Sequence, residues 1–196
     1  MAGDGAPRDA PATDAVNRPS GPPPLLVRRE APGGTAASAA VHARAFPTPE
    51  GAQAPAEAVL LERLRMSDSW LPHLSLVAAT ATGEVIGHAV CTRARVADHP
   101  VLALGPVAVV PDLQGRGVGS ALMHALLGAA EACDEPLVGV LGEPAYYGRF
   151  GFVPGLDVGV EAPDPGWAEY FQVRTLSAHT PELRGRFRYP LPFDDL

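Results

Sequence analysis

The stretch VAVVPDLQGRGVGSALMHAL contains three glycines, Gly115, Gly117 and Gly119, in a segment of five residues. The segment lies between an apolar stretch and an amphipathic one. Glycine weakens a helix interior by about 1 kcal/mol relative to alanine, so glycines at a helix start call for a reason. Bare backbone lets several N–H groups surround an anion, and the following helix adds the positive end of its dipole. The stretch therefore predicts a cradle for a phosphate or pyrophosphate group, with a tight turn for close helix–sheet packing as the alternative.

The residues around this turn narrow the choice of phosphate ligand. A P-loop requires a lysine, and all 15 basic residues of the chain are arginines. Gly115-x-Gly117-x-x-Ser120 comes close to the dinucleotide-binding fingerprint, and Glu143 could bind a ribose. The unit lies in mid-chain behind a predicted antiparallel hairpin, however, and too few residues follow it for a six-stranded parallel sheet. A nucleotide-dependent oxidoreductase is therefore the weaker interpretation.

The hydrophobic pattern predicts the elements that position the glycine turn. Strands are expected at residues 25–30, 74–80, 84–96, 101–110 and 137–141, with one or two more by residue 176. Helices are expected at residues 33–46, 56–66, 118–132 and 145–150. The unit from residue 101 to residue 141 implies a parallel strand pair with a right-handed crossover. The sequence therefore predicts an α/β fold with a mixed sheet, antiparallel strands first and one parallel crossover in the middle.

The composition predicts a tail followed by one domain. Residues 1–23 are rich in Pro, Gly and Ala and have almost no large apolar side chains, which is typical of a disordered tail. Residues 24–196 are long enough to form a single domain with its own core. No apolar run is long enough to span a membrane, and the N-terminus lacks the apolar segment of a signal peptide.

The charge and the cysteines limit the partners. The net charge is −7, which argues against nucleic acid, because phosphate binding needs a basic face, and weakly against anionic membranes. Cys91 and Cys133 lie in no metal-binding pattern and are expected to be free thiols in a reducing environment. We therefore expect a cytoplasmic protein without a metal, a nucleic-acid partner or a membrane partner.

Two motifs in this order resemble one protein family. Gln114-Gly115-Arg116-Gly117-Val118-Gly119 fits Q/R-x-x-G-x-G/A, the acyl-CoA signature of the GCN5-related N-acetyltransferase (GNAT) family. Further along, YYGRFGF (residues 146–152) resembles the second signature of that family, a tyrosine ahead of Gly-Phe. The resemblance covers residues 25–176, and LGEPAYYGRFGF is most similar to a bacterial subgroup of predicted N-acetyltransferases. It implies the acyl-CoA N-acyltransferase fold, a central and mostly antiparallel sheet flanked by helices.

The resemblance implies acetyl-CoA as cosubstrate and assigns residues to it. In the family, the central strand separates from its neighbour, and its free backbone groups bind the pantetheine arm and polarise the thioester carbonyl. Amides of the glycine turn hold the pyrophosphate, and Arg116 either adds charge there or is a solvated surface residue. Tyr147 matches the family's general acid, which protonates or hydrogen-bonds the departing CoA thiolate. The expected acetyl-CoA contacts are Val107, Ala108, Val109, Gln114, Gly115, Arg116, Gly117, Val118, Gly119 and Ser120.

The sequence leaves the general base open. An alkyl amine titrates near 10, so a base or a water must remove a proton. Some family members carry a glutamate where this chain has Gly139. Glu143, followed by Pro144, also fits a plain helix start, and His88 fits a buried core residue.

The predicted function is transfer of an acetyl group from acetyl-CoA to a primary amine by direct attack in a ternary complex. The acceptor is an amine of a small molecule, a peptide or a protein, and the enzyme is a monomer or a homodimer. The alternative is a non-catalytic acyl-CoA-binding sensor or interaction module. An intact Tyr147 favours the enzyme, because a pure binder needs no phenol at the thioester.

Overall fold

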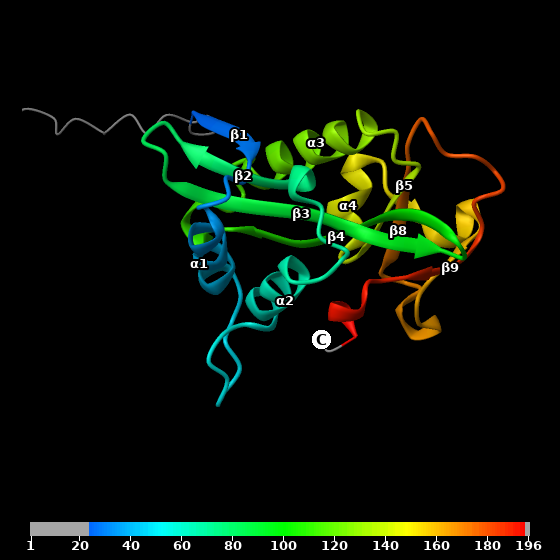
Figure 1. The fold of residues 1–196 in the computed structure, drawn as a ribbon, viewed down its shortest axis with the longest axis horizontal. Coiled ribbons are helices and arrows are strands. Elements are labelled where there is room, and N and C mark those ends of the chain that lie inside the picture. Colours follow the sequence, from blue (N-terminus) through cyan, green and yellow to red (C-terminus); the bar gives the residue numbers. More distant parts are fainter. Residues whose placement is uncertain (1–23, 195–196) are drawn as a thin grey trace, which may run out of the picture.

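The computed structural model describes residues 24–194, which form a twisted mixed sheet with helices on both faces (Figure 1). The predicted tail, residues 1–23, lies outside the described residues. The strands lie in the order β1 (Leu25–Arg29), β2 (Ser75–Thr80), β3 (Val85–Val96), β4 (His99–Val109), β5 (Leu137–Leu141), β8 (Phe171–Thr175) and β6 (Val153–Pro154), and β9 (Gly185–Arg188) pairs with β3 and with β7 (Val160–Glu161). The helices are α1 (Thr35–Ala45), α2 (Ala56–Arg65), α3 (Val118–Glu131) and α4 (Pro144–Tyr147).

The strand directions confirm the predicted mixed sheet. β1 to β4 are antiparallel neighbours, as are β5, β8 and β6, whereas β4 and β5 run parallel and are joined through α3. The β4–β5 ladder is short and contains only the pairs Leu102–Val138 and Ala103–Gly139. Beyond these pairs the two strands separate. β7 and β9 form a second short parallel ladder.

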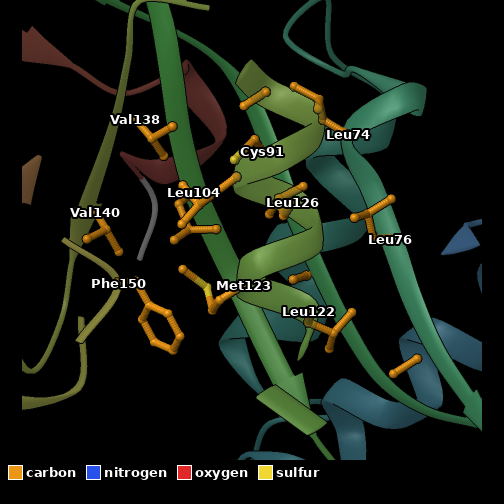
Figure 2. Packing of buried hydrophobic residues seen from close by; sticks show 14 of the residues in the cluster. Leu74, Leu76, Cys91, Leu104, Leu122, Met123, Leu126, Val138, Val140 and Phe150 are labelled. Atoms are coloured by element: carbon orange, nitrogen blue, oxygen red, sulfur yellow. The ribbon is translucent and has the colours of Figure 1, made fainter. Parts of the chain in front are cut away.

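Neighbouring residues of β3 show that α1 and α3 cover opposite faces of the sheet. A Cβ atom on Gly87 would lie 2.9 Å from Leu122 of α3, whereas the next residue, His88, contacts His42 of α1. Successive strand side chains point to opposite faces, so the two helices enclose β3 between them. Figure 2 shows the α3 side, where Leu122, Met123 and Leu126 pack over the strands.

The C-terminal part of the chain contains more strands than the one or two that the sequence predicted. β6, β7 and β8 precede residue 176, and β9 follows it. Phe187 of β9 lies over β5, and its ring fills the space that a side chain at position 139 would need. Gly139 is therefore required by packing, because an added methyl group would force the ring out of a buried cluster.

A chain of buried polar side chains connects the α1 face of the sheet with its N-terminal edge. The ring of His88 lies 2.9 Å from His42 at Nδ1 and 2.9 Å from the Ser75 hydroxyl at Nε2. Ser75 donates to a carboxylate oxygen of Glu30 at 2.8 Å, and Arg65 of α2 pairs with the other carboxylate oxygen at 2.6 Å. The histidine and serine side chains are almost completely inaccessible to solvent.

Burial keeps both histidines uncharged. It lowers the pKa of His42 to about 4 and that of His88 to about 3, and the positive charge of Arg65 acts in the same direction. Burial alone would raise the pKa of Glu30, but hydrogen bonds from Arg65, Ser38 and Ser75 hold it below its usual range. At neutral pH this buried hydrogen-bond chain therefore contains one carboxylate, that of Glu30, and two neutral imidazoles.

These shifts predict a loss of stability in mild acid. Unfolding releases the histidines to their ordinary pKa of 6.5, so the unfolded chain binds more protons as the pH falls from about 6.5 to about 4. The free energy of unfolding should fall by up to about 1.4 kcal/mol per pH unit for each histidine. Urea unfolding between pH 7.5 and pH 5 measures it, over a range in which Glu30 stays ionised. His42→Gln should flatten the slope and His99→Gln, at an exposed position, should not. A stability that is constant over this range would contradict the assignment of neutral buried histidines.

Candidate functional site

A cavity of about 630 Å³ opens where β4, the glycine turn and α4 meet. It lies beside the edge at which β4 and β5 separate, and the N-terminus of α3 forms one of its walls. Nine of the eleven predicted site residues line it. The complete lining is Val107, Ala108, Val109, Gln114, Gly115, Gly117, Gly119, Ser120, Tyr146, Tyr147 and Arg149.

The hydrogen-bond pattern of β4 determines which backbone groups are free to face the gap. Val110 donates to the carbonyl of Ile86 at 3.0 Å, and the register pairs Ala108 with His88. Hydrogen-bonded pairs alternate along an antiparallel ladder, so the N–H and C=O groups of Ala108 are hydrogen-bonded to β3. Val107 and Val109 turn theirs toward the gap, where the Gln114 side-chain amide already bonds the Val109 carbonyl at 3.0 Å. Ala108 therefore lines the cavity without offering backbone hydrogen bonds, unlike the sequence-based expectation.

The structure requires glycine at the three positions of the turn for two different reasons. Gly115 and Gly117 adopt left-handed φ angles of +71° and +84°, which side chains rarely tolerate. At position 119 a side chain would clash, because an added Cβ would lie 2.8 Å from the Tyr146 hydroxyl. α3 begins at Val118, and its first internal bond runs from the Ala121 N–H to the Gly117 carbonyl at 2.9 Å. The amides of residues 118–120 lie ahead of that ladder, as an anion site at a helix N-terminus requires.

Two predicted contact residues lie away from the cavity wall. The Val118 side chain is buried in the core, where a Cβ on Gly87 would be 3.1 Å from it, and the Arg116 side chain is exposed. Arg149, which is not among the residues predicted from the sequence, lines the cavity, and its guanidinium lies 4.6 Å from the centre of the Tyr146 ring. Its Nε donates to the Tyr146 carbonyl at 3.2 Å. The sequence feature that could have identified Arg149 as a site residue is its position as the one charged residue within the YYGRFGF motif.

Tyr147 is held by its neighbours at the edge of the cavity. Gly142 must be glycine because the Tyr147 ring occupies the space of a Cβ there, and the Tyr146 and Phe152 rings pack on it at 5.0 Å and 5.7 Å. Burial raises the pKa of Tyr147 to about 12, and the nearby Tyr146 phenol acts in the same direction. The phenol therefore carries its proton at neutral pH and can act as a hydrogen-bond donor.

The three positions considered for a general base have other roles in the structure. Phe187 fills the space beside Gly139. Glu143 is the N-cap of α4, where it accepts a hydrogen bond from the Ala145 amide at 3.4 Å and is followed by Pro144, as the helix-start interpretation predicted. His88 is buried between Ser75 and His42. The titratable side chains that line the cavity are two tyrosines and one arginine, and neither a neutral phenol nor a guanidinium group takes up a proton at neutral pH.

The described part of the chain contains no group of three or more His, Cys, Asp or Glu side chains that could hold a metal ion. None of the helices within residues 24–194 combines the length and the apolar character that a bilayer span requires. Cys91 is a buried free thiol and Cys133 is an exposed one.

Two known proteins are similar to the chain in sequence. The uncharacterized N-acetyltransferase YjhQ of Escherichia coli is 36% identical over 140 residues, which cover 67% of this chain and 77% of that protein. The uncharacterized N-acetyltransferase YhbS of Escherichia coli is 30% identical over 155 residues, which cover 78% of this chain and 88% of that protein.

Two solved structures share the fold. The crystal structure of YhbS from Escherichia coli in complex with CoA has a TM-score of 0.77 and 27% identity, and covers 87% of this chain and 92% of that one. The crystal structure of a GNAT family acetyltransferase from Brucella melitensis in complex with acetyl-CoA has a TM-score of 0.69 and 27% identity. The match covers 87% of this chain and 98% of that one. The model of the acetyltransferase (GNAT) family matches residues 40–152, more than half of the chain. The chain therefore belongs to the acetyltransferase (GNAT) family.

Proposed function

We propose that the protein transfers an acetyl group from acetyl-CoA to a primary amine by direct attack in a ternary complex. One observation carries the proposal: the Tyr147 phenol, the glycine-turn amides and the unpaired backbone of β4 face one cavity. The CoA and acetyl-CoA complexes of the two structural relatives support the choice of cosubstrate. The two free thiols fit the reducing cytoplasm that we propose as its location.

The cavity suggests how acetyl-CoA lies in it. The pyrophosphate binds the amides of residues 115–120, and the Arg149 guanidinium adds positive charge from the cavity wall. The exposed Arg116 adds positive charge within the turn. The pantetheine arm extends β4 in the gap, where Val107 and Val109 supply the backbone groups that β5 leaves unpaired. The thioester then lies beside Tyr147.

In the proposed reaction, the lone pair of the amine attacks the thioester carbonyl carbon. A β4 amide at the gap polarises the carbonyl oxygen and stabilises the negative charge that develops on it. The carbon–sulfur bond then breaks, the sulfur leaves with its electron pair, and the nitrogen gives up its surplus proton to solvent water. A thiol titrates near 8.5, well below Tyr147 at about 12, so the phenol stabilises the thiolate mainly by hydrogen bonding and transfers its proton less readily. A non-catalytic acyl-CoA sensor remains the second candidate, and amine-dependent release of CoA separates the two.

Replacing Tyr147 with Phe tests the phenol without disturbing the cavity. We expect acetyl-CoA affinity to stay within a few fold, whereas kcat falls by about 10²- to 10⁴-fold, the usual contribution of a positioned acid. Steady-state CoA release over a panel of amines, together with calorimetric acetyl-CoA binding, measures both. Tyr170→Phe, at an exposed tyrosine outside the cavity lining, is the matched control. Wild-type turnover in Tyr147→Phe would show that the ring only packs.

Replacing Gly117 with Glu tests the cradle. The new side chain meets the left-handed φ of +84° and places a negative charge among the amides that are proposed to hold the pyrophosphate. We expect acetyl-CoA binding to disappear in calorimetry. Gly128→Glu makes the same change on the exposed side of α3, where an added Cβ meets nothing within 4 Å, and should bind as the wild type does. Gly117→Ala separates backbone strain from charge, and tight acetyl-CoA binding by Gly117→Glu would locate the cradle elsewhere.

A further inference from the structure

Among the described residues, Arg149 supplies the one charged side chain of the cavity wall, and its neighbours fix its position. The guanidinium carbon lies 4.6 Å from the centre of the Tyr146 ring and 5.4 Å from the centre of the Phe150 ring. Its Nε donates to the Tyr146 carbonyl at 3.2 Å. The faces of aromatic rings attract a cation, and the hydrogen bond restricts rotation of the guanidinium plane. An arginine that is otherwise exposed is therefore held in one orientation.

This orientation leaves the two terminal NH₂ groups of the guanidinium available for a ligand. Within residues 24–194 the Arg149 side chain forms no ion pair, and its hydrogen bond to the protein comes from Nε. The planar fork of an arginine matches two oxygens of a phosphate group. The part of the cavity wall formed by the described residues contains no carboxylate. A phosphate that enters the cavity therefore has no acidic competitor in this wall.

Arg149 lies beside the glycine turn and not within it. The Tyr146 ring separates the two, because its hydroxyl would be 2.8 Å from a Cβ on Gly119 while the guanidinium covers its face. The Phe150 ring contacts the His124 ring with a centroid distance of 5.3 Å. His124 belongs to the second turn of α3, which begins at residue 118. The guanidinium thus lies along the flank of α3, away from the amides that point out of its N-terminus.

Acetyl-CoA carries phosphate at two separate places. The pyrophosphate joins the pantetheine arm to the ribose, and a third phosphate is attached to the 3′ oxygen of that ribose. In the proposed binding mode the pantetheine arm leaves the glycine turn along β4, so the ribose lies on the other side of the pyrophosphate. The amides of residues 115–120 supply donors for the pyrophosphate. The 3′-phosphate, which carries as much charge, needs a partner of its own.

We propose that Arg149 binds the 3′-phosphate of acetyl-CoA, and that Tyr146 and Phe150 position the guanidinium for this contact. The inference rests on the proposed placement of acetyl-CoA. The two NH₂ groups donate to oxygens of the 3′-phosphate, whereas the helix amides hold the pyrophosphate. A cosubstrate without the 3′-phosphate then binds less tightly, although its thiol and its pyrophosphate are the same. Arg149 is in this way a specificity-determining residue that selects the cosubstrate and takes no part in bond breaking.

Calorimetric binding of CoA and of 3′-dephospho-CoA at pH 7.5 tests the inference, because the two ligands differ only in this phosphate. The wild type should bind CoA at least about 10-fold more tightly, as expected for hydrogen bonds between charged groups. Arg149→Gln should bind CoA about 10-fold more weakly than the wild type and 3′-dephospho-CoA about equally well, so that the preference disappears. Arg116→Gln is the matched control, since it removes the same charge from an exposed position of the turn and should retain the preference.

Tyr146→Ala tests the positioning role of the ring. It leaves Arg149 in place but removes the surface on which the guanidinium lies, so the preference for CoA should fall. An unchanged preference would show that the ring does not position the guanidinium.

Two results overturn the assignment of Arg149. One is equal affinity of the wild type for the two ligands. The other is an Arg149→Gln variant that binds both ligands more weakly by the same factor, because the guanidinium would then act on the pyrophosphate. Neither ligand reacts in these measurements, so they are independent of acetyl transfer. A wild type that prefers CoA but shows no amine-dependent release of CoA from acetyl-CoA would contradict the proposed reaction alone.

Discussion

The site depends on one constraint, the early separation of two parallel strands. β4 and β5 pair at only two positions, and past Ala103 and Gly139 each strand has an edge without its neighbour. Buried backbone N–H and C=O groups need partners, so this gap can persist only where water, side chains or a ligand supply them. Gln114 supplies one such contact to Val109. The same separation leaves room for the glycine turn, the start of α3 and the Tyr147 ring around one cavity, so that an extended ligand can complete the sheet.

The second feature that organises the molecule is the polar chain behind β4. Burying a carboxylate, an arginine and two histidines in a core costs desolvation energy that apolar side chains would not. This hydrogen-bond chain joins Glu30, which directly follows β1, to β2, β3, α1 and α2, and it lies on the face opposite α3. The cavity, in contrast, opens at the gap and at the start of α3.

Most of the correct sequence-based predictions come from patterns among residues close together in the sequence. The helix and strand positions up to α4 follow from short-range periodicity, and the two motifs identified the family because the glycine turn and YYGRFGF are continuous in sequence. Contacts between residues far apart in the sequence could not be predicted from it. That Phe187 would fill the space beside Gly139 depends on a strand that pairs with β3 from the end of the chain. That Ala108 turns its backbone toward β3 follows from a register set by a bulge near Cys91. The partnership of His42 with His88 joins residues 46 positions apart, which no spacing rule predicts.

The central claim is that acetyl-CoA completes the gap between β4 and β5 with its thioester at Tyr147. A crystal structure of the protein with CoA or with a non-hydrolysable acetyl-CoA analogue tests it most directly. We expect the pyrophosphate on the amides of residues 115–120, the pantetheine arm bonded to the backbone of Val107 and Val109, and the sulfur within hydrogen-bonding distance of the Tyr147 hydroxyl. A cofactor bound outside this cavity, or a sulfur far from Tyr147, would contradict it.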